Sequence, residues 1–547
     1  FVLGRLGEKE KGLKILENSL NNFRKYYVEN STEYIELLVN YAEYLRENKI
    51  FKENPFLIYK SCYNFLQQHP WNVNLHNRVS LGYINSLIDN GGLQEALDST
   101  ASLIYRNAGL KVPEDYISNP DITYLKHDKI TIDILRAKYL ALLKLSEVNN
   151  DFRALSGSAA TAELMVNILE KIRLRAGEEE SRILLGERYR DAYLFAIESF
   201  KRCYELTGKN EYFEKVFEYS EKSKAACLLA SIRENKGLRF YVPPTLAGLE
   251  KELSIRIGYF EARINQENSK NEPDREKLKI WNEALIYATS KRDSLIGVFE
   301  KNYPDYYRLK YNTKVISSES VPEIAGKKTN FISYISADTI IYIIVVNGKN
   351  NIIATVPADS SLFSSIISFR NMLSEPDAER NAREDFRLFQ ETGYELYSSL
   401  IEPVKKYFIS DRLIISPDKE LSFIPFEAFL TANNRDTSLY HNRLQFLMNN
   451  YDISYTYSAT LLSESGTGKP SFFNNALVFA PLYEFPLVLD SIEIARQETY
   501  FTKQVLLPLK YAGEEAEYVT KVVHGKLLSG AMATKQAYTN EAGKYDI

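Results

Sequence analysis

The spacing of apolar residues changes once along this chain, near residue 312, and this change limits the fold more than any other feature. Before it, apolar side chains recur every three or four residues, as in Leu13, Leu16, Leu20 and Phe23, a spacing typical of amphipathic helices. After it, apolar segments of strand length alternate with helical segments. The sequence therefore predicts a helical N-terminal part followed by an α/β part.

Residues 1–240 are predicted to form a solenoid of stacked helix pairs. Polar or glycine-containing breaks separate the helical segments, among them Asn90-Gly91-Gly92 and Leu206-Thr207-Gly208. One helix pair cannot bury its apolar face alone, so neighbouring pairs stack and form a concave surface that suits a protein or peptide partner. A plain helical array without a ligand is the alternative interpretation.

Residues 241–311 are predicted to form a long helical hairpin that acts as a spacer. Two charged helical segments occupy about residues 245–269 and 276–302. The polar turn between them contains Pro273, which separates the two helices because proline cannot continue a helix. Two long helices joined by a short turn indicate an antiparallel pair.

Residues 312–547 are predicted to form the α/β domain. Short strands are expected at 330–335, 339–346, 352–356, 412–416, 451–456, 476–480 and 526–528. Helices are expected at about 359–374, 380–407, 458–463, 512–523 and 533–542. This alternation is typical of a mostly parallel, doubly wound sheet.

Composition argues against several functions. The 547 residues carry a net charge of −4, which gives no general attraction for nucleic acid. The longest apolar run, Thr339–Val346, is far shorter than the ~18 residues of a membrane helix. The five histidines and three cysteines show no spacing typical of a metal site or a disulfide framework. We therefore expect no membrane segment, no metal and no cofactor, while few cysteines suit the cytoplasm and the periplasm equally.

The cysteines are better explained as structural residues than as nucleophiles. Cys62 and Cys203 lie in tyrosine-rich helical segments, and Cys227 lies in the apolar run Ala225-Ala226-Cys227-Leu228-Leu229. A small thiol on an apolar helix face is expected to be buried and unreactive.

Two further motifs also have plain explanations. Gly466-Thr467-Gly468-Lys469-Pro470 resembles a phosphate-binding loop, but Ser463 replaces its first glycine and Pro470 its magnesium-binding hydroxyl, so a surface loop is expected. Glu427 follows a Pro-Phe pair. We expect this carboxylate to cap a helix N-terminus or to pair with an arginine. A role in a substrate site is the alternative, and nothing in the sequence supports it directly.

An ordered set of short segments resembles a known family. The first is Leu413–Phe429, which combines an apolar strand, a Pro-Asp turn and the segment Ile424-Pro425-Phe426-Glu427. The segments that follow in the same order are Tyr457-Ser458-Ala459-Thr460, Ala476–Ala480, Leu507-Pro508-Leu509 with Glu514-Glu515-Ala516, Leu527-Leu528, Ala533-Thr534 and Lys544–Ile547. Together they resemble the CHAT domain, a caspase-like domain associated with tetratricopeptide repeats, over roughly residues 313–547.

Upstream segments fit the same resemblance. Glu221–Ala225 and Tyr303–Tyr307 are similar to segments that precede such domains. Leu6-Gly7, Phe23 and Ala96 are similar to positions of a degenerate tetratricopeptide repeat, although the spacing between turns often exceeds the usual ~34 residues.

The resemblance implies a cysteine peptidase that acts on proteins through a Cys-His pair. In that family the histidine lies on or just after the strand that Tyr545-Asp546-Ile547 begins, and the cysteine lies on a later strand. The chain starts at Phe1 and no cysteine follows Cys227, so it is interpreted as a fragment that lacks both groups and is inactive by itself. No catalytic, cofactor-binding or metal-binding residue is therefore assigned. His524-Gly525 is interpreted as the end of a helix. A non-catalytic interaction scaffold with the same fold is the alternative.

Overall fold

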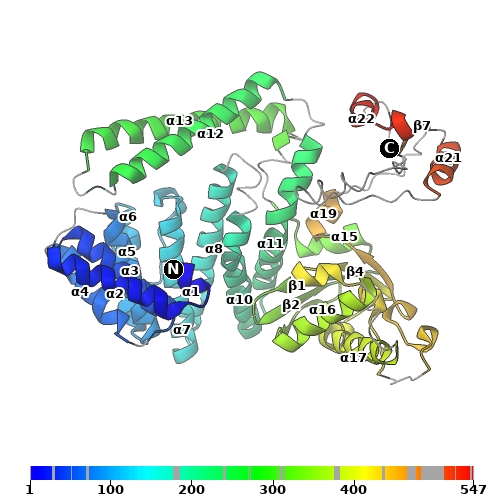
Figure 1. Ribbon diagram of the computed structural model, residues 1–547, viewed down its shortest axis with the longest axis horizontal. Helices are drawn as coiled ribbons and strands as arrows, with labels where there is room; N and C mark the ends of the chain where they lie inside the picture. The colour runs from blue at the N-terminus through cyan, green and yellow to red at the C-terminus, as the bar shows by residue number, and fades with distance from the viewer. Residues whose placement is uncertain are drawn as a thin grey trace, which may run out of the picture. The chain divides into compact units, whose positions relative to one another are not determined.

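The computed structural model describes most of the chain in two compact units, residues 1–464 and 465–547. The described residues are 2–26, 31–50, 52–68, 73–175, 185–237, 242–268, 270, 273–304, 306–307, 311, 314–374, 382–433, 438–464, 476–481, 511–523, 525–542 and 545. Most of them are helical, and the strands lie in the C-terminal part (Figure 1).

The N-terminal half of the first unit is a series of helices. They are α1 (Val2–Arg5), α2 (Lys9–Tyr26), α3 (Thr32–Glu47), α4 (Pro55–Gln68), α5 (Val73–Asp89), α6 (Leu93–Asn107), the 3-10 turn η1 (Ile122–Tyr124), α7 (Lys129–Asn149), α8 (Phe152–Arg175), α10 (Arg190–Thr207) and α11 (Asn210–Gly237). Helices adjacent in sequence contact one another, most extensively α7 with α8 and α10 with both α8 and α11. We call α1–α11 the helical region.

Capping residues explain where these helices begin and end. Asp128 begins α7, because its carboxylate accepts a hydrogen bond from the Thr131 backbone N–H at 2.9 Å. Gly208 ends α10 with a φ of 67°, a left-handed conformation that glycine adopts readily, and its N–H donates to the Tyr204 carbonyl at 2.8 Å. The glycine break at 206–208 in the sequence is therefore a helix C-terminus.

Two long helices follow, α12 (Pro244–Asn268) and α13 (Arg275–Asn302), and they pack along each other. Asp274 caps α13 by accepting hydrogen bonds from the Glu276 and Lys277 backbone N–H groups, both at 3.1 Å. The buried side chains of Leu253, Leu295, Phe299 and Tyr311 form the core of this hairpin.

A five-stranded sheet forms the centre of the α/β part, in the order β3-β2-β1-β4-β5. Its strands are β1 (Asn330–Ser336), β2 (Ile340–Val346), β3 (Asn351–Pro357), β4 (Arg412–Ser416) and β5 (Asp452–Tyr455). β1 is parallel to β4, and β4 is parallel to β5, whereas β1 with β2 and β2 with β3 are antiparallel.

The expectation of a mostly parallel sheet is therefore wrong for this sheet, which is mixed. The reason is the length of the connections, since parallel neighbours need a crossover of a dozen or more residues. Only a few residues separate β1 from β2 and β2 from β3, and the second turn uses Gly348 at a φ of 77°. The segment from β3 to β4 contains α16 (Ser360–Ser374), α17 (Ala382–Leu400) and α18 (Glu402–Lys405), which is long enough for a crossover.

The two faces of the sheet are buried by different parts of the first unit. One face joins the core of the helical region; its residues include Phe331, Ile335, Tyr342, Ile344 and Val346. The opposite face forms a core with α16, α17 and the segments around β4; its residues include Ile332, Tyr334, Ile341, Ile343 and Val345. Burial on both faces explains why residues 339–346 form a continuous apolar run instead of alternating with polar residues.

Short elements complete both units. In the first unit these are η2 (Ser318–Ser320), α15 (Val321–Ala325), η3 (Lys419–Phe423), η4 (Phe426–Ala428), η5 (His441–Arg443), η6 (Leu447–Asn449) and α19 (Ala459–Glu464). The second unit contains β6 (Leu477–Ala480), α21 (Ala512–Val522), β7 (Lys526–Ser529), η7 (Gly530–Met532) and α22 (Lys535–Glu541). β6 and β7 pair in parallel, with Val478 opposite Leu527.

Candidate functional site

The carboxyl ends of the three parallel strands β1, β4 and β5 lie at one edge of the sheet. In open α/β sheets, ligand sites form outside this edge. Here charged side chains from α10 and α11 reach it. We call the group the carboxyl-edge cluster; its members are Arg190, Glu221, Lys224, Ser333, Ser336, Ser416, Asp418, Ser458 and Thr460.

Lys224 of α11 joins β1 to β4. Its Nζ lies 2.9 Å from Ser333 Oγ, 2.7 Å from the Ser416 carbonyl oxygen and 2.6 Å from Ser416 Oγ. Ser333 and Ser416 are opposite each other in the parallel register, so one ammonium group binds both strands. Burial lowers the pKa of Lys224 to about 8, against the opposing effect of the Asp418 and Glu221 carboxylates.

Glu221, one helical turn before Lys224, binds the start of α19. Its carboxylate accepts hydrogen bonds from the Ala459 N–H at 3.1 Å, the Thr460 N–H at 2.8 Å and Thr460 Oγ1 at 2.8 Å. Backbone N–H groups at a helix start lack partners within the helix, so a carboxylate there is favourable. Glu221 therefore caps a helix that lies more than two hundred residues further along the chain.

Arg190, at the start of α10, contacts Asp418 in the turn after β4 and the Ser336 carbonyl oxygen at 3.3 Å. The Asp418 carboxylate also accepts a hydrogen bond from the Ser336 backbone N–H at 2.8 Å. The Pro-Asp turn after β4 thus connects the end of β4 with the end of β1, and Arg190 of the helical region contacts both ends.

The cluster is a buried junction. Glu221, Ser333, Ser416 and Ser458 have no exposed surface, and the charged groups named above are hydrogen-bonded within the cluster. Such an arrangement fixes the positions of strand ends and helix starts, because removing one partner leaves a buried polar group unsatisfied.

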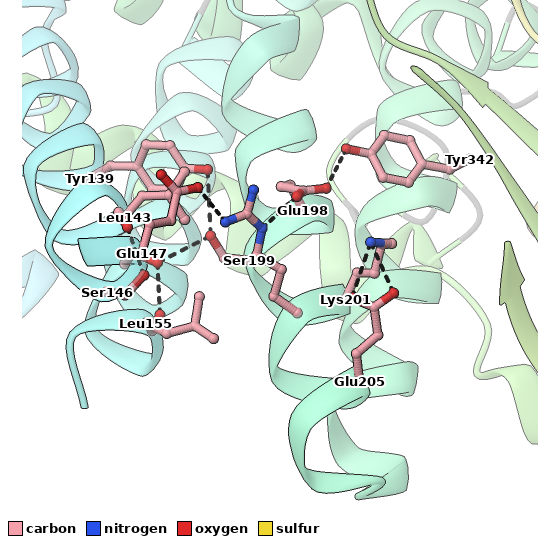
Figure 2. A network of polar contacts seen from close by, with 12 residues as sticks. Tyr139, Leu143, Ser146, Glu147, Leu155, Glu198, Ser199, Lys201, Glu205 and Tyr342 are labelled. Carbon is pink, nitrogen blue, oxygen red and sulfur yellow. Dashed lines mark hydrogen bonds and ion pairs between the residues drawn. The ribbon is translucent and has the colours of Figure 1, made fainter. Parts of the chain in front are cut away.

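A second polar network joins the helical region to β2 (Figure 2). Arg202 of α10 binds Glu147 of α7 at 2.5 Å and Glu198 at 2.6 Å, and the Tyr342 hydroxyl donates to Glu198 at 2.7 Å. Burial acts to raise the pKa of Glu198, but hydrogen bonds from Tyr342 and Arg202 outweigh it, and the pKa is lowered. Glu198 is therefore held as a carboxylate between α10 and the sheet.

Two serines, Ser158 and Ser199, extend this network among the helices. Ser199 Oγ lies 3.5 Å from the Tyr139 hydroxyl and 3.2 Å from Ser158 Oγ, and the Ser158 hydroxyl donates to the Leu155 carbonyl at 2.7 Å (Figure 2). The network connects α7, α8 and α10.

A groove runs between the loop at residues 117–122 and α8, with a volume of about 710 Å³. Its lining includes Ile117, Asn119, Gly157 and Glu163. Glu163 also faces α11, since its Oε1 accepts from Lys215 Nζ at 2.7 Å and from the Tyr219 hydroxyl at 2.9 Å. Glu163, one of the residues that line this groove, is therefore hydrogen-bonded to α11.

The structure describes the side chains of two of the three cysteines. Cys62 and Cys203 are buried, and burial raises the pKa of the Cys62 thiol to about 12 and that of Cys203 to about 11. Both thiols stay protonated at neutral pH, which suits a structural role. The side chain of Cys227, His524 and the stretch Gly466–Pro470 lie outside the described residues.

Glu427 neither caps a helix nor pairs with an arginine among the described contacts; its partner is a tyrosine. Its carboxylate accepts a hydrogen bond from the Tyr455 hydroxyl, and that hydroxyl accepts one from the Phe426 backbone N–H at 2.8 Å. The contact fixes the segment after the Pro-Asp turn against β5.

The described residues contain neither a metal-binding cluster nor a membrane-spanning helix. Those residues hold no group of three or more histidine, cysteine, aspartate or glutamate side chains arranged to bind a metal ion. Likewise, none of the helices within the described ranges is long and apolar enough to cross a membrane. The buried His76 instead contacts Arg106 and Ser80, and burial together with the Arg106 charge lowers its pKa.

Comparison with known proteins adds one finding. Residues 390–547 match the CHAT domain. The matched segment begins inside α17 and includes β4, β5, α19, β6, α21 and β7. No curated protein matches the chain. β1, β2 and β3 precede the matched residues, yet β1 pairs directly with β4 of the CHAT domain.

Sequence reasoning missed the carboxyl-edge cluster as a site. One signal is present, since Glu221–Ala225 is similar to segments upstream of such domains. The structure buries the face of α11 that carries Glu221 and Lys224, and the sequence alone does not show this burial. Nothing local in the sequence marks Arg190.

Proposed function

We propose that the full protein to which this chain corresponds is a caspase-like cysteine peptidase acting on protein substrates, with the helical part as its partner-binding and regulatory part. In this proposal residues 1–240 are a solenoid of tetratricopeptide type, residues 241–311 are a spacer and residues 312–547 are the N-terminal portion of the CHAT domain. The 547-residue chain itself is proposed to be inactive.

The match of residues 390–547 to the CHAT domain carries this proposal, because that domain is associated with caspase-like peptidases. The alternating strands and helices of the matched segment are consistent with it. Caspase-like chemistry needs a thiolate beside an imidazole, and residues 390–547 contain no cysteine. The nucleophile is therefore proposed to come from sequence beyond Ile547.

The test compares two chains. The purified 547-residue chain and, where the gene continues past the codon for Ile547, the longer chain that it encodes are each treated with or without iodoacetamide. After removal of the excess reagent, both are incubated with an unfolded protein substrate in reducing buffer. We expect iodoacetamide-sensitive cleavage from the longer chain only. Such cleavage by the 547-residue chain would show that the position assigned to the dyad is wrong.

A non-catalytic interaction scaffold is the second candidate. The observation that favours it is that the carboxyl edge, in the described part of the sheet, is filled by a buried junction to the helical region. Reading the gene past the codon for Ile547 separates the two. A histidine within a few residues and a cysteine some tens of residues later support the peptidase, whereas a stop codon or other residues there support the scaffold.

A further inference from the structure

α11 makes polar contacts on one side with α8, another helix of the helical region, and on the other side with the α/β part. Toward α8, its Lys215 and Tyr219 both bind the carboxylate of Glu163, at 2.7 and 2.9 Å. Further along the same helix, Glu221 and Lys224 bind the start of α19 and the end of β4. A single helix thus makes charged contacts with elements of both parts.

The contacts of α11 on the sheet side converge on one short segment, residues 457–460. Glu221 binds the backbone N–H groups of Ala459 and Thr460. Lys224 binds Ser416, whose hydroxyl in turn donates to the Tyr457 carbonyl at 2.7 Å. Both charged residues therefore determine where the chain runs as it leaves β5 and enters α19.

These contacts are suited to transmitting a shift and not only to holding two parts together. An apolar interface tolerates small sliding, whereas a carboxylate bound to two backbone N–H groups and an ammonium bound to three oxygens have narrow geometric requirements. A displacement of α11 must therefore either carry residues 457–460 with it or break buried hydrogen bonds.

We propose that α11 couples the helical region to the carboxyl edge of the sheet, with Glu163 setting the position of α11 and with Glu221 and Lys224 acting as positioning residues for residues 457–460. A partner that engages Glu163 competes with Lys215 and Tyr219 and so releases this control. The inference rests on the proposed function, because partner binding to the helical region supplies the displacement. It adds the route by which that binding reaches the CHAT domain.

The test uses amide hydrogen exchange on the 547-residue chain. Glu163→Ala breaks the contact between α8 and α11 without touching the sheet. If α11 transmits the change, amide exchange in residues 457–464 rises on the order of tenfold. The loss of a hydrogen bond to a charged group lowers local stability by an amount that corresponds to a rate increase of this size. Exchange in α16 and α17, on the other face of the sheet, is expected to stay unchanged.

The decisive measurement is non-additivity. In a Glu221→Gln background, Glu163→Ala is expected to add little to exchange in residues 457–464, because the connection is already broken. Equal effects in both backgrounds, or no effect of Glu163→Ala on residues 457–464, would overturn the proposal. If Glu221→Gln does not fold, Ser416→Ala provides a second background, since it removes the hydroxyl between Lys224 and Tyr457.

The matched control is Glu205→Ala. Glu205 lies in the helical region and pairs with Lys201 of its own helix α10, so its loss removes an ion pair without altering the contact between α8 and α11. We expect wild-type exchange in residues 457–464. None of these readouts depends on peptidase activity, so failure of the coupling leaves the proposed function standing, and an inactive longer chain leaves the coupling standing.

Discussion

Replacing Lys224 with methionine tests the electrostatic description of the junction. Burial lowers the pKa of Lys224 to about 8 from the ordinary value of 10.5. Because the folded-state pKa is the lower one, the unfolded chain binds more protons between about pH 8 and pH 10.5. The free energy of unfolding should therefore rise with pH across that window. Between pH 7 and pH 9.5 the wild-type protein should gain about 2 kcal/mol that the methionine variant does not gain.

The pH dependence is the quantity to measure, not the absolute difference at one pH. Methionine removes three hydrogen bonds of Lys224 but also removes the penalty for burying an ammonium group, and these two effects oppose each other. Only the ammonium group makes the difference between the two proteins depend on pH.

The assay is urea unfolding followed by pulse proteolysis, with peptides from β1 and β4 quantified by mass spectrometry at pH 7 and pH 9.5. A local readout is needed because a chain of several units does not unfold in one step. Lys222→Met is the matched control, since Lys222 lies on the same helix but pairs with Glu218. If the stability difference between wild type and Lys224→Met is the same at both pH values, the ammonium group is not held as described.

Three further predictions follow from the geometry. Cys62 and Cys203 should react slowly with a thiol reagent at pH 8 in the folded protein and quickly in urea, because burial raises their pKa values; residue-resolved mass spectrometry checks this, and fast labelling of the folded protein would contradict it. Gly208→Ala should destabilise the end of α10 by about 1 kcal/mol, since φ is 67° there; unchanged hydrogen exchange in residues 200–207 would contradict the assigned cap. Tyr342→Phe should lower the stability of the junction between α10 and β2 by about 2 kcal/mol through loss of the hydrogen bond to Glu198. Proteolytic unfolding monitored at β2 measures this loss, and a stability equal to wild type would refute it.

The sequence predicted individual elements well because their signals are local. The strand expected at 412–416 is β4 with the same bounds, and the helix expected at 512–523 is α21, Ala512–Val522. Strand direction depends on connection length as well as on alternation. Counting strands and helices therefore suggested a parallel sheet, whereas the short turn through Gly348 imposes an antiparallel pair.

The carboxyl-edge cluster could not be predicted in the same way. Its contacts between the helical region and the rest of the unit join residues more than one hundred positions apart, as with Lys224 and Ser333 or Glu221 and Thr460. Periodicity shows which face of a helix is apolar but not which distant polar groups meet. Glu221 and Lys224 also violate the local expectation that charged residues of a helix face solvent, and such violations commonly mark junctions or functional sites.

The CHAT match and the structure place the limits of the C-terminal part differently, and the difference bears on how the two parts work together. The matched residues begin at 390, within α17, but β4 pairs with β1 on one side and with β5 on the other. A unit that began at residue 390 would leave one edge of β4 unpaired, and unpaired edges promote aggregation. The face of β1 and β2 that carries Phe331 is buried by the helical region itself, where Phe331 packs against Phe217 of α11. The helical region therefore completes the core of the sheet instead of being an appended module, so a change in its helices alters the same packing and hydrogen bonds that stabilise the strands.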